Sequence, residues 1–96
     1  MALLSDADIE RGLAGMDGWR RGEGEPASIL RDFEFEDFAA ALAFVQRVGG
    51  AAEEANHHPD ILLYGWNKVR LTYSTHSEGG VTDADFTQAA RVSGLA

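Results

Sequence analysis

The sequence predicts an α+β domain with helices on one face of an antiparallel sheet, in the order helix, strand pair, long helix, strand pair, helix. Three observations predict it: helical spacing of apolar residues in a long central segment, alternation of apolar and polar residues in segments on either side, and a capping-box pattern near each chain end. The chain has 96 residues, which suits one small domain with one modest core. Residues 1–96 are therefore expected to form a single domain.

The N-terminal segment is expected to begin with a helix. Residues 5–8, Ser-Asp-Ala-Asp, have the form of a capping box, which predicts a helix over about residues 6–14 that closes near Gly15. A short strand is expected at about residues 18–21. The glycine-rich segment at residues 21–26 predicts a turn after it.

The middle of the chain changes from strand to helix periodicity. Residues 29–35 alternate, which predicts a strand with one buried face. Residues 37–57 predict the longest helix, which Pro59 is expected to end. Gly49-Gly50 weakens its middle and predicts a close approach by another segment. The expected buried stripe of this helix contains Phe38, Ala41, Leu42, Val45, Val48 and Ala52, and the aromatic residues expected in the core are Phe33, Phe35, Phe38 and Phe44.

The C-terminal half predicts a hairpin and a closing helix. Residues 61–64 and 68–75 predict two strands that pair across a turn at Gly65. Val69, Leu71 and Tyr73 of the second strand alternate with polar residues and are expected to face the core. Residues 82–85, Thr-Asp-Ala-Asp, form a second capping box, which predicts a helix to about residue 92 with Asp85 as its capping carboxylate.

The composition excludes several classes of function. Eight Lys and Arg residues against sixteen Asp and Glu residues give a net charge of −8, which disfavours direct binding of nucleic acid. The absence of cysteine excludes disulfides, thiolate catalysis and Cys-based metal sites, and it fits a reducing, cytoplasmic compartment. The sequence has no signal-peptide pattern and no apolar run long enough to span a membrane. We expect a cytoplasmic protein without membrane association.

The three histidines are the strongest candidates for chemistry, and two of them are adjacent. His57 and His58 fall at the expected C-terminus of the long helix, where unpaired carbonyls favour a protonated imidazole. Glu53, one turn earlier, is placed to orient His57. A histidine in this setting suits acid-base catalysis near neutral pH, and a solvated helix end is the alternative interpretation.

His76 is expected at the end of the last strand, on the face opposite the core. Trp66 shares that face, but about 33 Å of strand separates the two, so a common site would need a strand bend or a partner subunit. Tyr64 and Trp66 are both candidates for stacking on a planar ligand or for the core. A zinc site would have to combine the histidines with Glu53 or Asp60. Because adjacent helical residues point about 100° apart, no metal is expected.

Several chemically distinct positions form a spaced pattern over nearly the whole chain. They are Glu53-x-x-x-His57-His58-Pro59, then Trp66, His76 and Asp85, together with Asn67-Lys68-Val69, Ser74-Thr75-His76 and Phe33-x-Phe35-x-Asp37-Phe38. In these residues the chain resembles the pterin-4a-carbinolamine dehydratase family.

The resemblance implies one four-stranded antiparallel sheet with three helices on one side (α-β-β-α-β-β-α), in homodimers or homotetramers. It implies dehydration of 4a-hydroxytetrahydropterin (4a-hydroxytetrahydrobiopterin) to quinonoid dihydropterin without metal or organic cofactor. This reaction recycles the pterin of aromatic amino acid hydroxylases, so the implied partners are the pterin substrate and such a hydroxylase.

The resemblance also implies the site residues. The catalytic set is His57, His58 and His76, the substrate-binding set is Pro59, Thr75, Ser77, Glu78 and Trp66, and the supporting residues are Glu53 and Asp85. We expect His57 and His76 to share the acid and base work, and His58 to bind the pterin. The alternative is a non-catalytic protein-binding module that acts as a dimerisation cofactor for a partner protein, as some relatives do.

Overall fold

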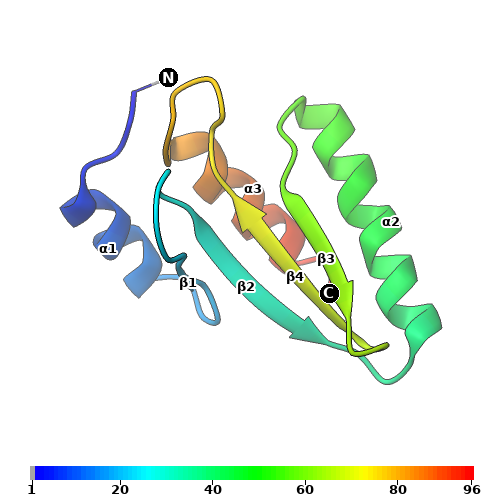
Figure 1. Cartoon of the computed structure of the whole chain (residues 1–96). Coiled ribbons are helices and arrows are strands. Elements are labelled where there is room, and N and C mark those ends of the chain that lie inside the picture. The colour runs from blue at the N-terminus through cyan, green and yellow to red at the C-terminus, as the bar shows by residue number, and fades with distance from the viewer. Residues whose placement is uncertain (1) are drawn as a thin grey trace.

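The computed structural model describes residues 2–96 and has the predicted order of elements (Figure 1). The elements are α1 (Asp6–Ala14), β1 (Arg20–Arg21), β2 (Ile29–Glu34), α2 (Phe38–Ala55), β3 (Asp60–Tyr64), β4 (Lys68–Tyr73) and α3 (Asp83–Ser93). The α+β class and the order α-β-β-α-β-β-α are confirmed.

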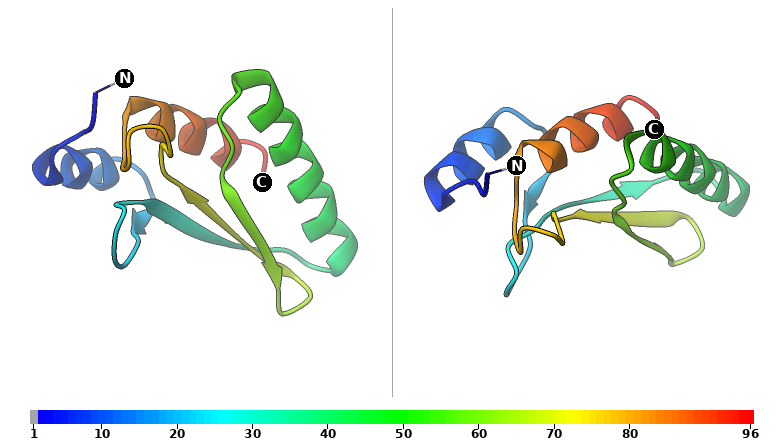
Figure 2. Two further views of the ribbon diagram at one scale, coloured as in Figure 1. Left: turned by 45° about the horizontal axis from the view of Figure 1, so that its top comes forward. Right: turned by 90° about the horizontal axis from the view of Figure 1, so that it is seen from above.

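The four strands form one antiparallel sheet in the order β1-β2-β4-β3. Strand β4 is central: it pairs with β2 from Ile29↔Tyr73 to Glu34↔Lys68 and with β3 along its other side. The three helices lie on one face of this sheet (Figure 2). The core lies between the two layers, and Val69, Leu71 and Tyr73 of β4 are fully buried in it, as their alternation predicts.

Trp19, just before β1, ties the sheet to α3. Its ring packs at 6.2 Å from the ring of Phe33 and at 6.0 Å from the ring of Tyr73. Its indole N–H donates to Ser93 Oγ over 2.8 Å. A hydrogen bond of this kind satisfies the one polar group of a buried tryptophan, so the aromatic cluster is fixed to the last turn of α3.

Helix α2 ends earlier than predicted. Asp37 caps its start by accepting from the N–H of Ala40, but the helix closes at Ala55 because Asn56 adopts the left-handed conformation, with φ 50° and ψ 43°. Asparagine tolerates this conformation and commonly ends helices in this way. Pro59 therefore does not end the helix, and His57 lies beyond it.

The buried side of α2 is also rotated from the predicted stripe. Phe38 and Leu42 are 50% and 42% exposed, whereas Phe44 is fully buried against Phe33, with ring centroids 4.7 Å apart. The apolar surface of α2 is broader than the side that the sheet and α3 cover, and a broad surface does not reveal which part of it is buried. The predicted close approach at Gly49-Gly50 is also wrong, because a Cβ at either position would meet nothing within 4 Å.

Candidate active site

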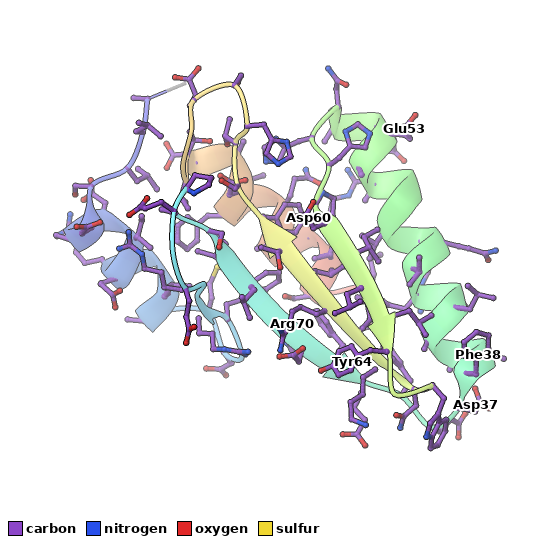
Figure 3. All side chains as sticks on the ribbon, viewed as in Figure 1. Asp37, Phe38, Glu53, Asp60, Tyr64 and Arg70 are labelled. Carbon is purple, nitrogen blue, oxygen red and sulfur yellow. The ribbon has the colours of Figure 1, made fainter. Side chains whose placement is uncertain are left out.

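Two segments far apart in the sequence meet at one end of the sheet and bring the three histidines together. One follows α2 and the other follows β4, and both lie at the same end of the molecule (Figure 1). Together they line a pocket of about 190 Å³ with the side chains of Asn56, His57, His58, Ser74, Thr75, His76 and Ser77. Glu53 and Asp60 mark this end of α2 and β3 (Figure 3).

His57 is held by a buried carboxylate. Its Nε2 lies 2.6 Å from Oδ1 of Asp85, and the two side chains are 15% and 0% exposed. The other oxygen of Asp85 accepts from Thr75 Oγ1 at 2.8 Å and from the backbone N–H of Thr82 at 2.9 Å. Because a carboxylate with these bonds is an acceptor, Nε2 of His57 is the donor. The ring therefore keeps Nδ1 for other partners.

Asp85 has two structural roles at once. It completes the predicted capping box with Thr82 at the start of α3, and it contacts His57 across the fold. Thr82 Oγ1 also lies 2.7 Å from Thr75 Oγ1. The capping-box pattern identifies Thr82 and Asp85 in the sequence, and the resemblance implies a supporting role for Asp85, but the spacing alone does not show that Asp85 contacts His57.

Glu53 pairs with a different histidine from the one predicted. Its Oε2 contacts Nε2 of His58 and not the ring of His57. The prediction assumed an unbroken helix through His57, but the left-handed turn at Asn56 ends the helical spacing and sends His57 toward α3. The side chains of Glu53 and His58 are 78% and 52% exposed, so their pairing contributes little stability and mainly orients the His58 ring.

Strand β4 stops at Tyr73, two residues before its predicted end, and the chain turns tightly around Thr75. The N–H of Thr75 donates to Gly80 O at 2.7 Å, and its carbonyl accepts from the N–H groups of Glu78 and Gly79 at 3.0 and 2.9 Å. This turn leaves His76 and Ser77 exposed at the pocket. Pro59 and Glu78 adjoin it in sequence but do not line it.

The two candidate stacking aromatics lie away from the histidines. Trp66 is in the turn between β3 and β4, at the opposite end of β4 from His76, with φ 61° and 62% of its surface exposed. Tyr64 donates its hydroxyl to Asp32 Oδ1 at 2.7 Å. Neither lines the histidine pocket, so within one chain the predicted role of Trp66 in substrate binding has no structural basis.

The comparisons with known proteins agree with the spaced pattern. The family model described as pterin 4 alpha carbinolamine dehydratase matches residues 2–95. The chain belongs to the pterin-4a-carbinolamine dehydratase family. This places it among hydro-lyases that act on a pterin, and it confirms the resemblance seen in the sequence.

Two proteins named as pterin-4-alpha-carbinolamine dehydratases are similar to this chain over nearly its whole length. One from Roseiflexus castenholzii is 46% identical over 91 residues, which are 95% of this chain and 94% of that protein. One from Thermomicrobium roseum is 43% identical over 96 residues, which are 100% of this chain and 99% of that protein.

Two solved structures share the fold. A transcriptional coactivator/pterin dehydratase from Brucella melitensis is 34% identical, with a TM-score of 0.92 and 99% of each chain covered. A pterin dehydratase-like protein identified as a RuBisCO assembly factor in the alpha-carboxysome is 28% identical, with a TM-score of 0.69 and coverage of 83% of this chain and 90% of that one.

One residue beside the histidine pocket was predicted only as part of the core. Tyr73, the last residue of β4, is fully buried, and its ring lies nearly parallel to the imidazole of His57, with centroids 6.0 Å apart and an interplanar angle of 9°. Burial raises the pKa of Tyr73 to about 12, and the negative charge of Asp85 acts in the same direction. Tyr73 is therefore a neutral ring against the histidine at any physiological pH.

The titratable side chains of the described residues do not form a metal site. Within residues 2–96, no group of three or more His, Asp or Glu side chains is placed to hold a metal ion. In the same part of the chain, no helix combines the length and the apolar character needed to cross a membrane.

Proposed function

We propose that this member of the family dehydrates 4a-hydroxytetrahydropterin to quinonoid dihydropterin, with two histidines as base and acid. The observation that carries the proposal is the convergence of His57, His58 and His76 on one pocket, with Nε2 of His57 held by the buried carboxylate of Asp85.

The reaction needs one proton removed and one supplied. The C4a–O bond breaks, and the hydroxyl leaves as water after it takes a proton. The electron pair of the N5–H bond forms the C4a=N5 double bond, and a base takes the N5 proton. Because both transfers occur near neutral pH, two imidazoles in opposite protonation states suit them.

The geometry favours His57 as the base. Its Nε2–H donates to Asp85, so the neutral ring carries its lone pair on Nδ1. When Nδ1 takes the N5 proton, the carboxylate of Asp85 compensates the positive charge, as the aspartate of a Ser-His-Asp triad does. His76 then protonates the leaving hydroxyl, and His58, oriented by Glu53, binds the pterin.

The size of the pocket favours an open site. Its volume of about 190 Å³ is below the roughly 300–1,000 Å³ typical of pockets that enclose a small molecule. Part of the pterin would therefore lie outside it, and a second subunit would cover that part. For this reason the homodimer or homotetramer implied by the resemblance stays part of the proposal, as do an aromatic amino acid hydroxylase as the user of the product and a cytoplasmic location.

Substitution of single histidines tests the assignment. His57→Ala and His76→Ala should each lower kcat about 10²-fold or more, because each removes a proton-transfer group. His58→Ala should act mainly on KM. Stopped-flow absorbance with 4a-hydroxytetrahydropterin measures these values, and wild-type rates in both of the first two variants would contradict the assignment.

Protein binding is the second candidate function. The two solved relatives carry names that include a transcriptional coactivator and a RuBisCO assembly factor. Four large apolar side chains on α2 and β3 are exposed here and could contact another protein: Phe38, Leu42, Ile61 and Leu62. A dehydration rate equal to the uncatalysed rate, together with capture of a specific protein partner, would favour this candidate.

A further inference from the structure

The imidazole of His57 is bounded by two different kinds of contact. Asp85 fixes one edge of the ring through Nε2. The face of the ring lies against Tyr73 at 6.0 Å, within 9° of parallel. A single hydrogen bond leaves an imidazole free to rock about that bond, and a parallel aromatic neighbour opposes this rocking because offset-stacked rings attract each other at such separations.

The ring of Tyr73 is held in place by its own packing contacts. Its ring is fully buried and also packs against the ring of Trp19, with centroids 6.0 Å apart. Trp19 is anchored to α3 by the hydrogen bond to Ser93 Oγ at 2.8 Å. A continuous row of rings therefore runs from the core to the catalytic pocket.

We propose that Tyr73 is a positioning residue for the dehydratase reaction, and that its ring face keeps the imidazole of His57 in the plane that directs Nδ1 to the substrate. The inference rests on the proposed role of His57 as a base. It concerns the ring of Tyr73 and not its hydroxyl, because within residues 2–96 that hydroxyl is buried without a hydrogen-bond partner.

The surroundings of Tyr73 fit this role. Burial, followed by the charge of Asp85, raises the pKa of Tyr73 to about 12, so the ring stays neutral and does not compete with Asp85 for the proton of His57. Tyr73 is fully buried and does not line the pocket. It can therefore act only through the ring of His57 and not by contact with the substrate.

Three substitutions separate positioning from general stability. Tyr73→Phe keeps the ring and removes the unpartnered hydroxyl. Tyr73→Leu removes the ring face from His57. Phe44→Leu is the matched control, because Phe44 is an equally buried aromatic whose ring contacts are with Phe33 and Phe35. If Tyr73→Leu does not fold, Tyr73→Met replaces it, since methionine fills irregular gaps.

The rates and the state of His57 are measured together. We expect Tyr73→Phe to keep kcat within about twofold and Tyr73→Leu to lose about 10-fold in kcat with KM little changed, because misplacement of a catalytic group acts on the chemical step. ¹⁵N spectra of the His57 imidazole should show Nε2 protonated and Nδ1 bare in the neutral wild type. In Tyr73→Leu the same tautomer should persist because Asp85 still accepts from Nε2, but the imidazole signals should shift and broaden because the ring moves between orientations. Phe44→Leu should change neither reading.

Unchanged kcat and unchanged imidazole spectra in Tyr73→Leu would overturn the inference, as would an equal loss of kcat in Phe44→Leu. If wild-type protein shows no dehydratase activity, the proposed function fails, and the imidazole spectra alone still decide whether Tyr73 positions His57.

Discussion

At the residue scale, Asp85 connects the stability of the fold with the chemistry of the pocket. One oxygen receives the Nε2 proton of His57, and the other is held by Thr75 and by the backbone at the start of α3. A carboxylate fixed in this way cannot turn, so it selects one tautomer of His57. The same side chain therefore caps a helix and leaves Nδ1 of His57 as the nitrogen available to a ligand.

Removing the charge of Asp85 should lower kcat more than removing an exposed charge from the same turn of α3. We expect Asp85→Asn to lower kcat about 10²-fold or more, because the amide can stabilise the wrong tautomer and cannot compensate the imidazolium. Asp83→Asn, an exposed change in the same first turn of α3, is the control and should keep wild-type kcat. Steady-state kinetics of both variants measure this, and equal rates would remove Asp85 from the mechanism.

The residue scale also shows what the sequence could not predict. Glu53 was expected to orient His57, but its carboxylate contacts His58, and the ring of His57 contacts Asp85. Helical spacing predicts partners only while the helix lasts, and propensity alone does not locate the residue at which a helix ends. One left-handed residue, Asn56, was enough to change which histidine contacts Glu53.

At the element scale, the two segments that line the pocket are fixed by different local structures. A left-handed asparagine ends α2, and a tight turn around Thr75 follows β4. The periodicities of both elements were visible in the sequence, since they depend on many residues. Their ends depend on one or two residues each, and the site is built from those ends.

Glycine substitutions in two helices should have opposite effects on stability. Gly50→Ala should raise the free energy of unfolding by about 0.5–1 kcal/mol, because alanine costs less backbone entropy in a helix interior and its Cβ meets nothing within 4 Å. Gly12→Ala should lower it, since that Cβ would lie 2.6 Å from the ring of Phe86. Urea unfolding measures both, and destabilisation by Gly50→Ala would indicate a packing role for α2 that the structure does not show.

A charged cluster on the sheet face away from the helices should make stability depend on pH. The guanidinium of Arg70, which donates to both oxygens of Asp32 at 2.9 and 3.2 Å, holds the pKa of that carboxyl well below its usual range. Burial opposes this effect, whereas hydrogen bonds from Tyr64 and Arg20 reinforce it. The cluster joins β2, β4 and β3 across the sheet.

The sign of the pH dependence follows from the lowered pKa. Ionised Asp32 stabilises the fold above its unfolded pKa of about 4, and this contribution is lost as the pH falls from there toward the folded value. Asp32→Asn should therefore be less stable at neutral pH and lose less stability on acidification. Urea midpoints of both proteins between neutral and acidic pH measure the difference, and parallel curves would show that Asp32 does not contribute.

At the scale of the whole molecule, the strand order explains why residues spaced along the sequence line one pocket. The antiparallel order β1-β2-β4-β3 brings the end of β4 beside the segment between α2 and β3, and so assembles residues separated by almost twenty positions. The spaced residues therefore predicted the family and identified the three histidines as candidate site residues, and the periodicities predicted the fold class. The length of the strand also predicted that Trp66, at the far end of β4, lies far from His76 within one chain.

The small size of the molecule leaves its pocket shallow. A pocket of about 190 Å³, formed by the segments that follow α2 and β4, suits a planar substrate held partly by a second subunit. Light scattering over a range of protein concentrations would show a dimer or tetramer if this is correct, and a stable monomer with full activity would show that one chain is sufficient.

Stopped-flow measurement of 4a-hydroxytetrahydropterin dehydration decides whether the His57 imidazole catalyses this reaction, with wild type, His57→Ala and buffer compared at one pH. We expect rapid, saturable loss of the carbinolamine with wild type, and a kcat about 10²-fold lower with His57→Ala. A wild-type rate equal to that in buffer, or full activity without the imidazole of His57, would contradict this expectation.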